Sequence, residues 1–333
     1  MAEIAEKKFE HFLDVSLKIR AKMIGKMEPD DRCRLTRCSK LCNKEAKSSK
    51  NYIYEVRFDC RWPTNITIDV NYLKYDGVMD RRLGFTLMFF EQSGKKLRTY
   101  ESLDNWQISN KLELNYWTDM FEYAMNELKQ LLQSYQQSIR KFSFTALSSI
   151  NEAYNLASLD FGIENWGNLE NLYALGDIDV RQIFSKLQKP LKTLNIHGEN
   201  DAILESKEEI YKTQDDLVWW NANLNYQEFL QLRAKDVAIH LGKMTEKDVF
   251  MFIRSWQNGK LGKEIRNYQW ILRNSNFDKQ NFLRLLRVSD PEGEEKIEIK
   301  HYKIPGKSAT LMFYYNVLRF NAGLVENYRR LLV

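Results

Sequence analysis

Apolar residues recur at strand spacing in the first third of the chain. Three segments are apolar or alternate apolar with polar residues and so predict strands: 52–58, 66–73 and 84–90. Turn residues follow at Asp76-Gly77 and Ser93-Gly94, and a short further strand is expected at 112–114. From Trp117 to Tyr135 the apolar positions change to helical spacing. Residues 51–138 are therefore predicted to be a strand-rich segment that ends in a long helix.

The rest of the chain alternates short strands with helices. Apolar runs predict strands at 139–144, 169–175, 191–196, 235–240, 267–272 and 296–301, and helical spacing predicts helices at 179–187, 246–257 and 279–286. Strands follow one another after roughly 20 to 45 residues, which is the range of leucine-rich β/α solenoids. We expect residues 139–333 to form an irregular leucine-rich-like α/β array, with a single irregular α/β domain as the alternative. Pro305-Gly306-Lys307 predicts a terminal β-hairpin.

The N-terminal residues predict a short helical hairpin. The first helix has one apolar stripe, made by Val15, Ile19, Met23, Ile24 and Met27. Pro29 ends this helix and suits the first turn of a second one, which places Leu35 and Cys38 inward. Residues 1–50 are thus expected to be a separate unit in front of an α+β or α/β body.

This hairpin resembles an F-box. Val15-Ser16 stands at the Leu-Pro start of the family pattern, Met23-Ile24 at the aliphatic pair, and Cys38-Ser39-Lys40 at Val-Ser-basic. Ser16 replaces the usual Pro, and Arg20, where many F-boxes have Leu, is similar to the nematode branch of the family. The resemblance implies a docking site for the Skp adaptor of a cullin-RING ubiquitin ligase, formed by Val15, Ser16, Ile19, Met23, Ile24, Met27, Leu35 and Cys38. The alternative is a hairpin that merely caps the next domain.

A second resemblance covers about 70 residues after Trp219. A helix that starts near Leu224-Asn225-Tyr226, a strand, a helix started by Thr245 and the pair Trp256 and Gly259 are similar to the type 2 F-box-associated domain. Thr245 with Asp248 forms a capping box. The resemblance implies that this domain recruits target proteins.

Composition and charge agree with a binding protein. The 333 residues carry a formal charge of +5, and residues 1–50 alone hold 13 basic against 8 acidic residues, so the excess is local to the predicted hairpin. Such a charge suits an acidic protein partner better than a nucleic acid along the whole chain. The charged start does not look like a secretory signal, and no apolar run reaches the roughly 20 residues of a membrane span. Four Cys do not make a disulfide framework, which favours the cytoplasm or nucleus.

Motifs for chemistry are absent from the sequence. There is no Gly-rich phosphate loop, no GxSxG elbow, no HExxH and no paired CxxC, so we expect no enzyme, no cofactor, no catalytic residue and no metal site. His197 lies beside carboxylates, but a turn after a strand explains it better. Trp219 and Trp220 are adjacent; in an extended segment they point to opposite faces, which leaves one of them for target binding.

These features predict the substrate-recognition subunit of a cullin-RING (SCF-type) ubiquitin ligase, which links the Skp adaptor and cullin complex to an unknown target protein. A repeat-type interaction scaffold without a ligase role is the first alternative. An RNA-binding module is the second, and a hydrolase that uses His197 is the most distant.

Overall fold

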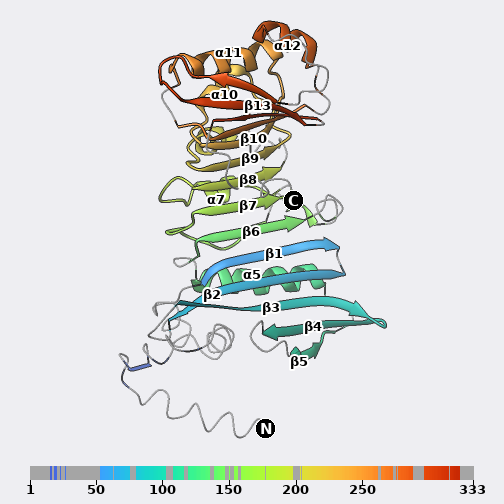
Figure 1. Ribbon diagram of the computed structural model, residues 1–333. Coiled ribbons are helices and arrows are strands. Elements are labelled where there is room, and N and C mark those ends of the chain that lie inside the picture. Colours follow the sequence, from blue (N-terminus) through green and yellow to red (C-terminus); the bar gives the residue numbers. More distant parts are fainter. Residues whose placement is uncertain are drawn as a thin grey trace, which may run out of the picture. The chain divides into compact units, whose positions relative to one another are not determined.

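The computed structural model describes a mixed α+β protein (Figure 1). It describes residues 53–322 except 63, 76–79, 103–107, 116–118, 136–138, 147–149, 151–153, 157–158, 177, 198–202, 204, 262–263, 273–274, 276, 288–295 and 315, together with Ser16, Ile19, Arg20, Met23 and Met27. The chain forms two compact units: unit 1 is 1–169 with 186–189, and unit 2 is 170–185 with 190–333. The boundary expected after residue 138 therefore falls later, after Leu169.

Unit 1 is an antiparallel meander with one parallel strand added. Its strands are β1 (Ile53–Trp62), β2 (Asn65–Tyr75), β3 (Asp80–Gln92), β4 (Lys95–Ser102), β5 (Ile108–Glu113) and β6 (Lys141–Ala146). The sheet order is β6-β1-β2-β3-β4-β5, and only the β1–β6 pair is parallel. Ser93 and Gly94 both have positive φ, 53° and 73°, which is the geometry of a tight hairpin turn between β3 and β4. The turn predicted there is confirmed.

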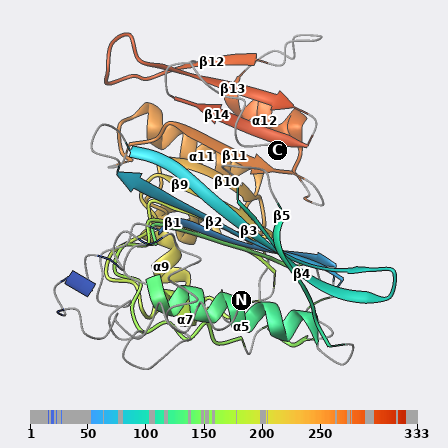
Figure 2. The ribbon, with the colours of Figure 1, turned by 90° about the horizontal axis from the view of Figure 1, so that it is seen from below.

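Helix α5 (Met120–Tyr135) covers one face of the unit 1 sheet (Figure 2). Phe121 meets Phe58 of β1 edge-on with ring centroids 6.1 Å apart, and Tyr123 meets Phe89 of β3 at 5.9 Å. Alternate residues of β1, β2 and β3 are buried, as the period of two requires. Within residues 51–138 the structure thus has strands β1 to β5 followed by the long helix α5.

Unit 2 is built on a ladder of short parallel strands. β7 (Asn171–Leu175), β8 (Thr193–His197), β9 (Asp216–Trp220), β10 (Asp236–His240) and β11 (Asn267–Ile271) pair in chain order (Figure 1). The first residues of these strands share one ladder position, and their spacings along the chain are 22, 23, 20 and 31 residues. Each strand with the connection before it is one rung.

The same main-chain contact joins successive rungs. The carbonyl of Lys192 accepts hydrogen bonds from two consecutive amides, those of Asp215 at 2.9 Å and Asp216 at 3.0 Å. The carbonyls of Glu170, Asp215 and Lys235 do the same with the next rung. This repeated contact sets the register, so that the apolar residues of every rung point to the same face.

An antiparallel cap ends the unit 2 sheet. β14 (Val317–Asn321) inserts between β11 and β13 (Ser308–Tyr314), and β12 (Lys296–Lys300) lies outside β13, so the order is β12-β13-β14-β11-β10-β9-β8-β7. The hairpin predicted around Pro305-Gly306-Lys307 is confirmed as β12–β13. The sequence did not indicate β4, β9 or β14 as strands.

The helices of unit 2 are short. They are α7 (Arg181–Phe184), α9 (Lys207–Tyr211), α10 (Tyr226–Gln231), α11 (Glu246–Gln257) and α12 (Lys279–Leu286). The bounds predicted for α11 and α12 are those observed. The Thr245 amide donates to the Asp248 carboxylate at 2.8 Å, so the predicted capping box is confirmed. Gly259 follows the helix with φ +61°, a conformation that suits glycine at a helix end.

The predicted N-terminal hairpin lies almost entirely outside the described residues, and so do Val15, Ile24, Leu35 and Cys38. Ser16 is described, and its carbonyl accepts from the amides of Ile19 and Arg20, both at 2.9 Å, as at the start of a helical turn. Ile19 and Met23 are exposed. In the part of the chain that the structure describes, no helix has the length and apolar character needed to cross a membrane.

Candidate functional site

The two faces of the unit 2 sheet differ in what covers them. One face packs against helices: Phe252 of α11 stacks on Tyr268 of β11 at 5.2 Å and meets Phe320 of β14 at 6.0 Å, and Phe282 of α12 meets Phe313 of β13 at 6.0 Å. We call it the covered face. The alternate residues of the same strands form the opposite face, which we call the open face.

The register arranges the side chains of the open face in rows that cross the strands. The row that begins at the starts of the parallel strands contains Thr193, Asp216, Asp236, Asn267, Asn321, Thr310 and Glu298. The middle row contains Tyr173, Asn195, Val218, Ala238, Gln269, Arg319, Met312 and Lys296. The first row is charged or polar throughout, and the middle row mixes charged, amide and apolar groups, whereas the covered face is largely apolar.

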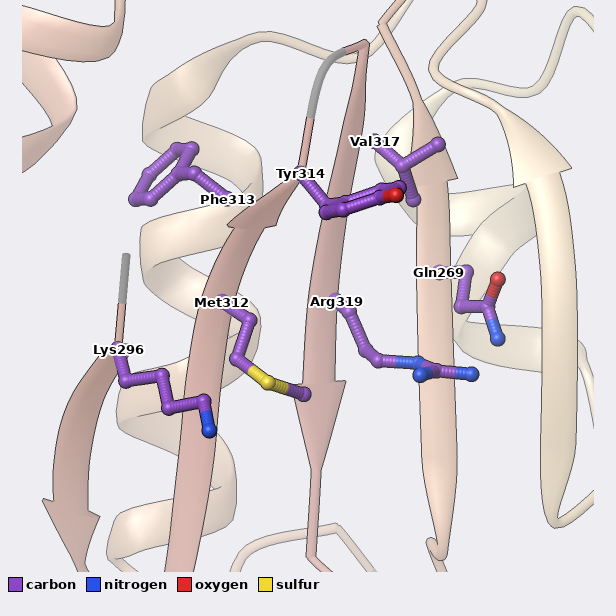
Figure 3. Close-up of a pocket in the computed structure, with 7 residues that line it drawn as sticks. All are labelled: Gln269, Lys296, Met312, Phe313, Tyr314, Val317 and Arg319. Atoms are coloured by element: carbon purple, nitrogen blue, oxygen red, sulfur yellow. The ribbon is translucent and has the colours of Figure 1, made fainter. Parts of the chain in front are cut away.

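A hollow of about 240 Å³ lies where the open face crosses the antiparallel cap (Figure 3). In this view the helices lie behind the sheet, and Met312 and Arg319 project from its near side. The hollow is mostly apolar, and two cations and one amide border it. Its lining residues are Gln269, Lys296, Met312, Phe313, Tyr314, Val317 and Arg319.

Hydrogen bonds hold the Arg319 guanidinium in place. With its amide oriented so that the oxygen faces donors, Gln269 accepts from Arg319 Nη2 at 2.8 Å and from Arg319 Nε at 3.3 Å. The same oxygen accepts from Asn267 Nδ2 at 2.9 Å. Asn267 and Gln269 are buried, at 0% and 2% exposure, so the guanidinium rests on a rigid amide pair.

A carboxylate pair lies on the open face at the start of β9 and β10. Asp216 and Asp236 occupy the same ladder position. Asp216 accepts from the Thr193 hydroxyl at 3.3 Å, and Asp236 pairs with the Arg266 guanidinium at 2.5 Å. Burial raises the pKa of Asp236 to about 6; the Arg266 guanidinium lowers this pKa, and the Asp216 carboxylate raises it.

Trp220 lies on the open face in a row with two histidines. His197 is its ladder partner on β8, and the Trp220 and His240 rings meet edge-on at 6.2 Å. Trp220 is half-buried, whereas Trp219 is 0% exposed on the covered face. The adjacent pair is therefore divided between core and surface. His197 ends a strand and is exposed.

The structure brings together residues that the sequence did not single out. Lys296, Met312 and Arg319 lie on three neighbouring strands, and Gln269 lies on a fourth. Each stands in an alternating strand pattern, as many surface residues do, and only the strand order makes them neighbours. Trp220 and the hollow lie on the same face but at different strands.

The described residues include no metal-ligand cluster and one free cysteine. No group of three or more His, Cys, Asp or Glu side chains among them is placed to hold a metal ion. Cys60, the one free cysteine in this part of the chain, is buried, and burial raises the pKa of its thiol to about 12, which keeps it protonated and unreactive.

Comparison with known proteins gives no relative: no family model matches the chain, and no curated protein and no solved structure matches it.

Proposed function

We propose that the protein is a target-binding subunit of a cullin-RING ubiquitin ligase, with the open face as the surface that holds the target. The observation that carries the binding role is the division of the unit 2 sheet. The covered face takes all the aromatic packing against α10, α11 and α12, while the same strands present Trp220, Tyr314, Arg319 and Lys296 on the other face. Tyr, Trp and Arg are the residues that most often dominate protein interfaces.

The leucine-rich-like interpretation of unit 2 belongs to this proposal. Rungs of 20 to 31 residues each contribute one five-residue strand and a connection with short helices. No rung can bury its apolar face alone, so the rungs stack, and stacking produces a broad sheet face that reaches many target residues at once.

The link to a ligase rests on the F-box-like segment at 12–43. In this role the protein performs no chemistry itself. It raises the local concentration of target lysines near an E2 enzyme held elsewhere in the complex. The apolar stripe of the first helix would divide between the hairpin's own packing and the adaptor, and exposed Ile19 and Met23 agree with that division.

The direct test is capture of a Skp-family adaptor and cullin by the full chain. We expect wild type to bind and the double variant Ile24→Asp, Leu35→Asp to lose binding while its thermal melt stays unchanged. Adaptor binding that survives in the double variant rejects the docking site. A wild-type chain that binds target but never the adaptor is a scaffold without a ligase role.

An RNA-binding role finds less support. Asp216, Asp236 and Glu298 lie in one row of the open face, and they would repel phosphates along most of it. Salt-dependent binding of RNA by the full chain, lost on charge reversal at Lys296, would favour that role instead.

A further inference from the structure

We propose that the hollow bordered by Lys296, Arg319 and Tyr314 is a subsite for a phosphotyrosine side chain of the target. This inference rests on the proposed use of the open face as the target surface. It adds what the sequence and the fold leave open, namely the chemical class of the group that the surface recognises.

Two cations border the hollow from different strands. Met312 pairs with Arg319 of β14 on one side and with Lys296 of β12 on the other, so the two basic residues flank it in one row (Figure 3). Neighbouring strands are about 4.8 Å apart, which puts the two Cα atoms on the order of 10 Å apart and lets the side chains share one ligand. A dianionic phosphate uses both charges, whereas a carboxylate uses one.

The two cations are held differently. Gln269 fixes the Arg319 guanidinium through two nitrogens, at 2.8 and 3.3 Å, so this cation is oriented before a ligand arrives. Lys296 is exposed and makes no ion pair with any residue that the structure describes. A fixed guanidinium with an adjustable ammonium is a suitable pair for a phosphoryl group, since Arg supplies geometry and Lys supplies charge.

The remaining wall of the hollow is apolar. It favours a ligand with an aromatic ring between its phosphate and the main chain of the target. Met312, Val317 and the Tyr314 ring form this wall, and Tyr314 is 56% exposed. The volume of about 240 Å³ is below the roughly 300–1,000 Å³ of sites for drug-sized ligands, so the hollow suits one side chain. A phosphoserine is too short to fill the apolar part while its phosphate reaches both cations.

The surroundings disfavour an extended polyanion. Glu298 is exposed two residues from Lys296 on the same strand and face, and Asp236 lies in the same row as Glu298 further along the sheet. A chain of phosphates would meet these carboxylates, whereas a single phosphorylated side chain would not. The site therefore selects an isolated dianion with an aromatic body.

The test measures binding of small probes to the full chain by titration calorimetry at constant ionic strength. We expect phenyl phosphate to bind at least about tenfold more tightly than inorganic phosphate or phenol, since only phenyl phosphate uses both the cations and the apolar wall. N-acetyl-phosphotyrosine amide should bind as phenyl phosphate does, and N-acetyl-phosphoserine amide about tenfold more weakly.

Variants locate the binding. Lys296→Gln should weaken phenyl phosphate about tenfold, and Lys300→Gln is the matched control, because Lys300 lies on the same strand and face but outside the hollow. Lys300→Gln should change the affinity less than twofold. Tyr314→Leu should weaken phenyl phosphate about fivefold and leave inorganic phosphate unchanged. Thermal melts of the three variants should match wild type, since all three residues are exposed.

Three results would overturn the proposal: no binding of phenyl phosphate at millimolar concentration, equal losses in Lys296→Gln and Lys300→Gln, or phosphoserine bound as tightly as phosphotyrosine. The probes need neither adaptor nor target, so a failure here leaves the ligase proposal standing. Conversely, a wild-type chain that does not bind the adaptor would reject the ligase proposal and leave the phosphotyrosine subsite standing.

Discussion

The covered and open faces of the unit 2 sheet are made by the same strands, yet they differ in the burial and in the polarity of their side chains. On the covered face, Ile196, Trp219, Ile239 and Trp270 occupy equivalent positions in successive rungs, and each is 0% exposed. The next residue of each rung belongs to the open face and is a histidine, tryptophan or isoleucine with less complete burial. One step along the chain therefore separates a fully buried position from one on the open face.

This difference shows how a five-residue strand can supply both a core face and an open face. Side chains alternate with a period of two, so a one-residue shift of register would exchange the faces. The paired amides that each rung donates to the carbonyl before it, such as those to Lys192, oppose such a shift. Substitutions at neighbouring positions should then have different consequences, and the first prediction below tests that.

The largest effect is expected for Trp219→Ala. Loss of this fully buried side chain leaves a cavity among apolar neighbours and should lower the free energy of unfolding by about 3–5 kcal/mol. Trp220→Ala, one residue later on the open face, should cost less than about 1 kcal/mol and weaken target capture instead. Urea unfolding beside target pull-down separates the two. Equal destabilisation by both variants would mean that the open face is also core at this rung.

A smaller effect is expected from the carboxylate pair. The folded pKa of Asp236, about 6, lies above its ordinary value of 3.8, so the folded state takes up the proton first. This group therefore makes the protein more stable as pH falls from ~7 towards ~4, and it costs stability above its folded pKa. Asp216→Asn removes one source of the raised pKa. It should raise the free energy of unfolding at neutral pH by about 1 kcal/mol and reduce the gain on acidification.

The measurement is urea unfolding of wild type and Asp216→Asn at ~pH 7 and ~pH 5. Asp215→Asn is the matched control, since Asp215 pairs with Lys235 at 3.2 Å and precedes the strand. The control should lose a few tenths of a kcal/mol at both pH values. Destabilisation by Asp216→Asn at neutral pH would give a different result. It would show that the hydrogen bond from the Thr193 hydroxyl to Asp216 stabilises the fold more than the repulsion between Asp216 and Asp236 destabilises it.

The smallest effect concerns the helix layer behind the covered face. The Asn225 side chain accepts from the Glu228 amide at 3.0 Å, and Glu228 accepts from the Asn225 amide at 2.9 Å, which caps α10 reciprocally. Asn225→Ala should cost about 1 kcal/mol and Asn225→Gly only a few tenths, because Gly is tolerated as a cap. Thermal melts report the cost, and phenyl phosphate binding should be unchanged in both. A loss of binding would show that the two faces are coupled.

Local signals accounted for the elements that were predicted correctly. α11 and α12 start at capping residues and keep helical spacing to their ends, so their bounds followed from neighbouring residues alone. β4 was missed because KKLRTYES is mostly polar, and only its pairing with β3 and β5 makes it a strand. β9 and β14 are five residues long and contain no turn signal of their own, so strand formation there depends on partners distant in sequence.

The sequence by itself determined most of the strands, the bounds and caps of α11 and α12, and the apolar residues of the strands that it indicated, because these depend on spacing within a few residues. Tertiary structure decided the strand order, and with it the open face. Insertion of β14 between β11 and β13 puts Arg319 beside Gln269 and opposite Met312, and β12 then brings Lys296 to the same hollow. Nothing local selects these neighbours, since strand pairing is a long-range choice made by the burial of whole faces.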